Sequence, residues 1–258
     1  FYSRGLATAR DAWCYNSSSE SLNANIKRSM DFYNDQRYQL SKGFIKDVEY
    51  DLTQISWTTS VLNLALKNQE ITQDKIGEKV ISLYRPFFKQ IGYYSRFWNE
   101  RVYQLPKLFP TSKYKNLVIC VKGIGDKDFS CLIADCIPDL QVIFNGQCFP
   151  LYWYEENKNK QQTLSLFDTE SSDDYIRRDG ITDWILKEVR TRFGNARKIT
   201  KETIFYYVYG LLHSPKYREA FAADLKKSLP RIPIVEDIDA FLDFSYAGKQ
   251  LANLHLNY

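Results

Sequence analysis

Two carboxylates near the middle of the chain have the residue types and spacing for metal chemistry. Pro138-Asp139 followed by Glu156 and Lys158 matches a PD…ExK nuclease signature. In such a site the two carboxylates hold Mg²⁺ and the lysine helps to activate a water molecule. The pattern is loose, occurs often by chance, and ends in a polar segment, residues 155–175, where a metal is difficult to hold. A Mg²⁺-dependent nuclease is therefore an alternative interpretation, not the main one.

Other catalytic patterns are missing from the sequence. It contains no Gly-x-x-x-x-Gly-Lys-Ser/Thr loop for nucleotide phosphates, no Gly-rich methyl-donor loop and no Asn-Pro-Pro-Tyr-type motif. The two histidines, His213 and His255, are far apart in the sequence and fall at predicted helix ends, which favours structural roles. Cys131 and Cys136 alone are too few for a zinc site. We therefore expect no catalytic residue, no metal site and no bound cofactor.

Residue types that read DNA bases are concentrated between residues 89 and 101. Arginine or lysine pairs with guanine, and asparagine or glutamine pairs with adenine, when a side chain meets a base edge. The segment places these types between aromatic residues: Lys89, Gln90, Arg96, Asn99 and Arg101. The sequence therefore predicts a first DNA-reading segment here.

A second candidate segment follows a predicted buried strand at residues 117–121. Two glycines, Gly123 and Gly125, favour a tight loop, and carboxylates beyond them could accept hydrogen bonds from cytosine amino groups. The candidate DNA-binding residues of this loop are Lys122, Asp126, Lys127 and Asp128. An ordinary turn between strands is the alternative interpretation. Lys113 and Lys115, beside the strand, are expected to contact phosphates.

The charge distribution is uneven although the formal net charge is only +4. Seven basic residues lie between Arg85 and Lys115, against Glu100 alone. Such an asymmetry is typical of a protein with one nucleic-acid face. A second basic cluster at residues 177–201 is interrupted by acidic residues, which favours a solvated surface. Aromatic residues make up 16% of the chain, which suits either a binding surface or a tyrosine-rich core.

Composition indicates a globular protein of 258 residues with 44% hydrophobic and 26% charged residues. Five cysteines, an odd number in apolar or mixed contexts, are expected to be reduced in a cytoplasmic protein. No apolar run reaches transmembrane length and no signal peptide is present. Because the chain begins with Phe1, we expect it to be a fragment of a longer protein.

The order of elements predicts an α+β fold. Helical segments come first, with Ser17–Glu20 spaced as a capping box before a helix that runs to about Asn34. A central mixed or antiparallel sheet is expected at about residues 79–154, including strands at 129–133, 140–144 and 148–154. Helices return afterwards, so the flanks of the sheet are helical at both ends. The expected parts are therefore residues 1–78, 79–154 and 155–258.

The stretch from Ile199 to Val235 predicts two helices and a strap. Thr200 can cap the first helix, and Ser214-Pro215 ends it and starts the second. A stripe of Tyr217, Phe221 and Leu225 predicts one buried face on the second helix, and residues 229–233 should then run extended.

This stretch also carries a family resemblance. The run YYVYGLLHSPKYREAFAADLKKSLPRIPIV (206–235) resembles the C-terminal target recognition domain of single-polypeptide Type I (Type ISP) restriction–modification enzymes. Further matches, in the same order, are ATARDAWCYN (7–16), SLYRPFFKQIGYY (82–94), LVICVKGIGDKDFSCLIADCIPDL (117–140) and QCFPLYWY (147–154). The resemblance therefore extends over nearly the whole chain and points to the recognition domain alone.

The resemblance implies recognition of double-stranded DNA beside an adenine-N6 methyltransferase domain of the same polypeptide. S-adenosylmethionine, ATP and Mg²⁺ would then be bound by other domains, together with the translocase and the nuclease. The chain itself would be one target recognition domain of residues 1–258. Two alternatives remain: the PD…ExK nuclease, and a structural coupling module that does not bind DNA.

Overall fold

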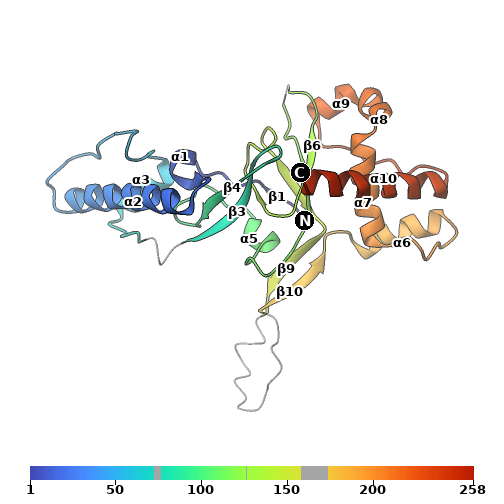
Figure 1. The fold of residues 1–258 in the computed structure, drawn as a ribbon, viewed down its shortest axis with the longest axis horizontal. Helices are drawn as coiled ribbons and strands as arrows, with labels where there is room; N and C mark the ends of the chain where they lie inside the picture. Colours follow the sequence, from blue (N-terminus) through green and yellow to red (C-terminus); the bar gives the residue numbers. More distant parts are fainter. Residues whose placement is uncertain (73–76, 126, 158–173) are drawn as a thin grey trace, which may run out of the picture. The chain divides into compact units, whose positions relative to one another are not determined.

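The structure is a computed structural model that describes residues 1–72, 77–125, 127–157 and 174–258. Its contacts divide the chain into two compact units, which are described separately (Figure 1). Unit 1 contains Phe1–Arg4, Gln104–Cys136 and Ile143–Tyr258, and unit 2 contains Gly5–Tyr103 and Ile137–Val142.

Unit 1 is built on an antiparallel sheet with the strand order β1-β8-β5-β6. Its strands are β1 (Ser3–Arg4), β5 (Val118–Val121), β6 (Cys131–Ala134) and β8 (Gln147–Pro150). Every residue of β5 and β6 is buried, because short apolar runs without alternation suit strands covered on both faces. A separate antiparallel pair is formed by β9 (Tyr152–Glu156) and β10 (Tyr175–Asp179).

The helices of unit 1 follow the strands. They are α5 (Leu105–Leu108), α6 (Asp183–Arg192), α7 (Lys201–His213), α8 (Pro215–Ala220), α9 (Ala222–Lys227) and α10 (Ile238–Leu256). Thr200 and Ser214 cap α7 and α8 with their side-chain oxygens, as the sequence predicts. The second predicted helix is instead interrupted at Phe221, whose ring is partly exposed, and continues as α9.

Helices α7 and α10 hold the centre of unit 1 together (Figure 1). A side chain at Gly210 would lie 2.2 Å from the Phe244 carbonyl oxygen, and one at Gly248 would lie 2.0 Å from the Tyr206 carbonyl oxygen. Only glycine therefore permits the two backbones to approach this closely. The Tyr207 ring stacks on Phe241 with centroids 4.1 Å apart.

Unit 2 begins with helices and adds a mixed sheet. The helices are α1 (Asp11–Cys14), α2 (Ser19–Ser41) and α3 (Thr59–Leu66). The strands are β2 (Tyr15–Asn16), β3 (Glu78–Arg85), β4 (Phe88–Tyr94) and β7 (Ile137–Pro138), in the order β2-β4-β3-β7. β3 and β4 form an antiparallel hairpin, and β7 pairs parallel to β3. Helix α2 buries Leu22, Ile26, Met30 and Tyr33 at helical spacing.

The α+β class is confirmed, with a different distribution of strands. The strands between residues 78 and 156 supply most of two four-stranded sheets and one two-stranded pair, where one central sheet was expected. The strands form separate sheets because of long-range pairing. β4 pairs with β2 and β3 pairs with β7, whereas β8, β5 and β6 form a sheet with β1. The predicted strand at 140–144 is wrong, because the Gln141 N–H donates to Asp139 Oδ1 and a turn follows.

Other expectations stay predictions. The three-part division at residues 78/79 and 154/155 is not tested by these contacts. Most of the predicted polar loop at 155–175 lies outside the described residues. Within the described ranges, no helix combines the length and apolar character needed to cross a membrane.

Candidate nucleic-acid interface

The first predicted reading segment contains a rigid turn, residues 95–101, that directly follows β4. Ser95 Oγ accepts hydrogen bonds from the backbone N–H groups of Phe97 (3.2 Å) and Trp98 (3.1 Å). Asn99 Oδ1 accepts from the Ser95 N–H at 2.7 Å, and Asn99 Nδ2 donates to the Tyr93 carbonyl at 3.1 Å. Each bond joins groups only a few residues apart, so the turn is fixed by its own side chains.

Trp98 anchors this turn in the interior of unit 2. Its ring is fully buried and meets Tyr33 edge-on at 6.1 Å between centroids. The buried guanidinium of Arg10 lies 5.3 Å from the Trp98 ring centroid and donates through Nε to the Trp98 carbonyl oxygen at 3.2 Å. Burial lowers the pKa of Arg10 from its usual value, while the nearby Glu100 carboxylate opposes that shift. The turn therefore rests on a packed aromatic and charged base.

The side chains that leave this base define the outward face of the turn. Arg96, Phe97 and Arg101 are exposed, whereas Asn99 is only 3% exposed. The prediction that Asn99 reads a base is therefore corrected, because both ends of its amide hold the turn together. Lys89 and Gln90 lie half-buried in β4, opposite Leu83 and Ser82 of β3.

The second predicted segment, the loop after β5 in unit 1, is also held internally. Lys122 is buried, and its Nζ donates to the Gly125 carbonyl at 2.6 Å. The Gly123 N–H donates to the Phe144 carbonyl at 2.8 Å, and the Gly125 N–H donates to the Lys226 carbonyl at 3.3 Å. Lys122 therefore closes the loop from inside, which corrects its prediction as a DNA contact.

The remaining candidates of unit 1 differ in their surroundings. Lys127 is exposed, and the exposed Asp128 forms an ion pair with Lys226 at 3.3 Å. Asp126 lies outside the described residues. Lys113 and Lys115 are exposed on the segment that leads into β5. These positions suit contacts with a charged partner better than a defined pocket.

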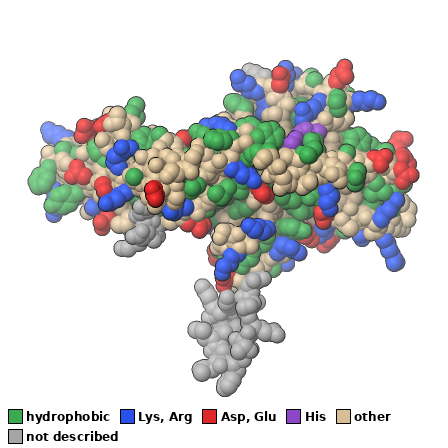
Figure 2. All heavy atoms as spheres, viewed as in Figure 1, with side chains coloured by type: hydrophobic (Ala, Val, Ile, Leu, Met, Phe, Trp, Pro, Cys, Tyr) green, Lys and Arg blue, Asp and Glu red, His purple; other side chains and the backbone are tan. Residues whose placement is uncertain are grey.

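The two predicted segments belong to different units of the chain. Lys89 to Arg101 lie in unit 2, and Lys113 to Asp128 lie in unit 1. On the face in view in Figure 2, basic side chains are interspersed with acidic and apolar ones. Charge alone therefore does not mark an interface on that face.

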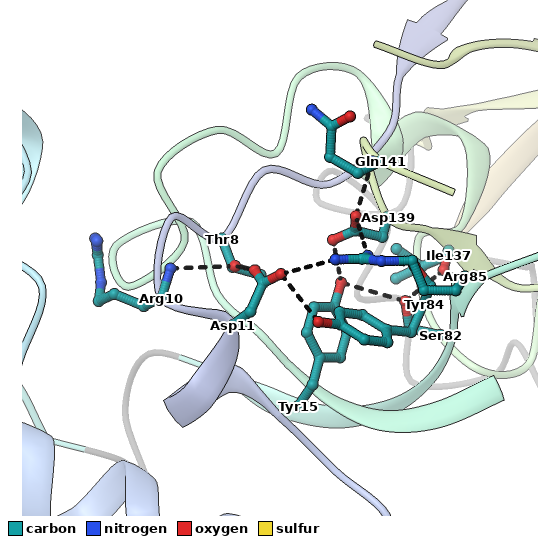
Figure 3. A network of polar contacts seen from close by, with 10 residues as sticks. All are labelled: Thr8, Arg10, Asp11, Tyr15, Ser82, Tyr84, Arg85, Ile137, Asp139 and Gln141. Atoms are coloured by element: carbon teal, nitrogen blue, oxygen red, sulfur yellow. Dashed lines mark hydrogen bonds and ion pairs between the residues drawn. The ribbon is translucent and has the colours of Figure 1, made fainter. Parts of the chain in front are cut away.

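Sequence reasoning missed a polar network centred on Asp139 in unit 2 (Figure 3). The Asp139 carboxylate accepts hydrogen bonds from the Gln141 N–H (2.8 Å), Arg85 Nη1 (3.0 Å) and Tyr15 Oη (3.1 Å). Arg85 Nη2 also lies 3.3 Å from Asp11 Oδ2, and its guanidinium sits 3.8 Å from the Tyr84 ring centroid. The network therefore fixes the end of the β3–β4 hairpin to the N-terminal segment and to the residues after β7.

The Asp139 network also bears on the nuclease alternative, because it engages one of the two carboxylates of the PD…ExK signature. Burial raises the pKa of the Asp139 carboxyl to about 6, while the Gln141 N–H, Arg85 and Tyr15 oppose that shift. The Asp139 carboxylate already accepts hydrogen bonds from three protein donors, so it is a poor ligand for Mg²⁺. Among the described residues, no three Asp, Glu, His or Cys side chains group as a metal site. Lys158 of the proposed signature lies outside them.

A signal for this network existed in the sequence. Three of the stretches that carry the family resemblance, residues 7–16, 82–94 and 117–140, each contribute to it. The residues that these stretches contribute are two carboxylates, one arginine and tyrosines. These residue types can form an ion-pair network between the stretches.

The two histidines lie close together in unit 1, although they are far apart in the sequence (purple in Figure 2). Their ring centroids are 5.4 Å apart, and His213 Nε2 lies 3.2 Å from Cys131 Sγ. Burial, Arg218 and His255 lower the pKa of His213 to about 4, and burial raises the pKa of Cys131 to about 12. A neutral imidazole beside a protonated thiol is not an activated nucleophile, so these contacts support structural roles.

The chain belongs to the family described as the Type ISP C-terminal specificity domain, whose model matches residues 1–258. Solved structures similar to the whole chain include the ATP-dependent Type ISP restriction–modification enzyme LlaBIII bound to DNA, at 33% identity and a TM-score of 0.82. A DrdV–DNA complex matches at 30% identity and a TM-score of 0.82. No curated protein matches the chain.

A third similar structure is a nuclease-deletion mutant of the Type ISP restriction–modification enzyme LlaGI in complex with a DNA substrate mimic, at 31% identity and a TM-score of 0.78. The matches cover 100% of this chain but only 15%, 23% and 22% of the LlaBIII, DrdV and LlaGI chains. The chain therefore corresponds to a small part of each of these polypeptides.

Proposed function

We propose that this chain recognises a specific sequence in double-stranded DNA on behalf of an adenine-N6 methyltransferase domain in the same polypeptide. The observation that carries the proposal is the match of the entire chain to a specificity-domain family and to three structures solved with DNA or a DNA mimic. In this role the chain holds the duplex while one adenine is turned out into the pocket of the neighbouring domain.

The turn at residues 95–101 is the part of unit 2 best suited to base reading. Its backbone is fixed by Ser95 and Asn99, so Arg96 and Arg101 project from a base that does not need to be ordered on binding. Arginine can donate two hydrogen bonds to O6 and N7 of guanine. Phe97 adds an exposed ring beside them. Lys127 in unit 1 is a second candidate for base contact.

Phosphate positioning is assigned to Lys113 and Lys115, which are exposed beside β5. Lysine contacts to phosphates fix the register of a protein on the duplex without carrying sequence information. We infer that this chain contributes recognition and no chemical step. ATP, S-adenosylmethionine and Mg²⁺ would serve other domains of the polypeptide.

The test compares a cognate and a scrambled duplex in salt titrations with the intact polypeptide. Arg96→Ala and Arg101→Ala should each lose roughly 1–3 kcal/mol on the cognate duplex and far less on the scrambled one. Lys67→Ala, an exposed lysine of the same unit outside the turn, is the matched control.

Two outcomes would contradict the proposal at different levels. Equal losses on both duplexes, or none, would exclude the turn as the reading surface. If neither duplex is bound even at low salt, the chain is a structural coupling module. Mg²⁺-dependent plasmid cleavage by residues 1–258 alone, abolished by Asp139→Ala or Glu156→Ala, would instead restore the nuclease interpretation.

A further inference from the structure

The tip of the β3–β4 hairpin displays two aromatic rings to solvent. Arg85 of β3 pairs with Phe88 of β4, so the turn consists of Pro86 and Phe87 alone. The Phe87 side chain is 46% exposed and the Phe88 side chain is 47% exposed. Phe88 also meets the Tyr84 ring edge-on at 6.4 Å between centroids, yet close to half of each phenylalanine side chain faces solvent.

The backbone of Phe87 is in an unfavourable conformation for its residue type. Its φ is +56°, in the left-handed region that glycine and asparagine adopt readily and a bulky residue does not. Proline fixes a negative φ at the first turn position, so the positive φ must fall on the second, where glycine is the usual residue. A strained residue that also exposes its ring points to a role for that ring outside the fold.

The two strands of the hairpin are held in place up to the turn, in contrast to the exposed rings at its tip. β3 is paired on both sides, by β4 and by the parallel strand β7. At the tip, Arg85 is held between Asp139 and Asp11 and stacks on Tyr84 (Figure 3). A ring at the end of such a support keeps its direction when it meets another surface, because little flexibility remains below it.

The chemistry of the tip and the comparisons favour DNA as its partner. Apolar and aromatic side chains, phenylalanine and proline among them, are used as wedges that open a base step and kink the duplex. Structures similar to the whole chain contain DNA or a DNA mimic.

We propose that Phe87, at the tip of the β3–β4 hairpin, inserts its ring at one base step of the recognised duplex. This inference rests on the proposed DNA-recognition function. The ring replaces stacking that the opened step loses, while Pro86 and the neighbouring backbone enter the groove with it. A kink at a fixed distance from the reading turn then contributes to selectivity, because base steps differ in how easily they open.

The test uses the intact polypeptide and duplexes that carry 2-aminopurine in turn at each position of the recognised sequence except the target adenine. The fluorescence of 2-aminopurine rises when it is unstacked. Wild-type protein should give a rise at one step, and Phe87→Trp should keep it. Phe87→Gly should abolish the rise and weaken cognate binding by about tenfold, the effect of losing one stacked ring.

Phe87→Gly separates function from folding, because glycine fits φ of +56° without strain and should leave the melting temperature equal or higher. Phe44→Ala, which removes an exposed ring of unit 2 outside the hairpin, is the control and should bind as wild type.

Four results would overturn the wedge. A Phe87→Gly protein with wild-type fluorescence and affinity, or a wild-type protein that binds without any rise, excludes insertion but leaves DNA recognition intact. A lower melting temperature of Phe87→Gly with unchanged fluorescence means that the hairpin packs on another part of the polypeptide. If the wild-type protein does not bind the cognate duplex, both the proposed function and the wedge are wrong.

Discussion

The two units of the chain are stabilised by different kinds of interior. The centre of unit 1 is apolar and aromatic, with α7 against α10 over a continuous hydrophobic cluster. Both units also bury polar residues, Asn116 and Lys122 among them in unit 1, but in unit 2 the buried Asp139 carboxylate is the centre of a network of ion pairs and hydrogen bonds. Apolar packing tolerates many arrangements, whereas a satisfied polar network requires one. The comparison indicates that the interior of unit 2 fixes the orientation of its elements. A surface that must present side chains in fixed directions requires this.

The largest expected effect is a cavity in the apolar unit. Leu211 of α7 is buried, as the helical stripe in the sequence predicts. Leu211→Ala should lower the free energy of unfolding by roughly 2–5 kcal/mol, measured by chemical denaturation. Leu254→Ala, on an exposed position of α10, should change it little. A Leu211→Ala protein with wild-type stability would mean that unit 1 does not depend on this packing.

Acid should destabilise unit 1 through His213. Its folded pKa of about 4 lies below the usual 6.5, so the unfolded chain binds a proton that the folded chain does not. Stability should therefore be lost as the pH falls from about 6.5 to about 4, by less than the roughly 3 kcal/mol that the shift alone would give, because the side chain is partly exposed and water screens its interactions. His213→Gln should remove this part of the pH dependence. An unchanged slope in the variant would exclude His213 as its source.

Unit 2 should respond to pH in the opposite sense through Asp139. Its folded pKa of about 6 lies above the usual 3.8, because burial disfavours the carboxylate. The resulting stabilisation is complete below about pH 4 and is lost as the pH rises through 6, again by up to about 3 kcal/mol. Relative to wild type, Asp139→Asn should therefore gain stability as the pH rises. A difference that does not vary between pH 4 and 7 would contradict this assignment.

Removal of Arg85 should have a somewhat smaller effect, because its side chain is 37% exposed and water screens the ion pair. Arg85→Met should cost about 1–3 kcal/mol at pH 7.5 and less at pH 5, where Asp139 is increasingly protonated. The double variant Arg85→Met with Asp139→Asn should recover part of the loss, since no buried charge is left unpaired. Additive losses in the double variant would show that the two residues are not coupled.

The smallest expected effects are those of phosphate contacts in unit 1. Lys113→Ala and Lys115→Ala should each weaken cognate and scrambled duplexes alike, and reduce the slope of log K against log salt by about one. The comparison with Arg101 of unit 2 is direct, because that residue is expected to discriminate between the duplexes. Selective loss on the cognate duplex for Lys113→Ala would assign base reading to unit 1.

Local features of both units could be predicted from the sequence. Thr200 and Ser214 begin helices where their side chains reach the N–H group three residues on, whereas the cap of α2 is Ser18, one residue beyond the predicted Ser17. Strand β5 follows from an apolar run, and the exposure of Arg96 and Arg101 follows from a polar turn after a strand. These features depend on residues within one or two turns of each other, which is the range of sequence periodicity.

Long-range features could not be predicted in the same way. Arg85 and Asp139 meet across 54 positions, and His213 meets Cys131 across 82. Asn99 has the residue type of an adenine contact, and only its burial assigns it to the turn. No local pattern encodes which distant segments meet.

The return of residues 137–142 to unit 2 has a consequence for synthesis of the protein on the ribosome. Residues 104–136 of unit 1 leave the ribosome before β7 and Asp139, so the β3–β4 hairpin waits for its parallel partner and for the ion pair with Arg85. At about 5–20 residues per second, the interval from Tyr103 to Val142 is roughly 2–8 seconds. Strand β1 waits still longer for β8. The nascent chain therefore exposes an unfinished sheet edge in each unit at the same time, which is the interval in which a chaperone or slower translation would most affect the yield of folded protein.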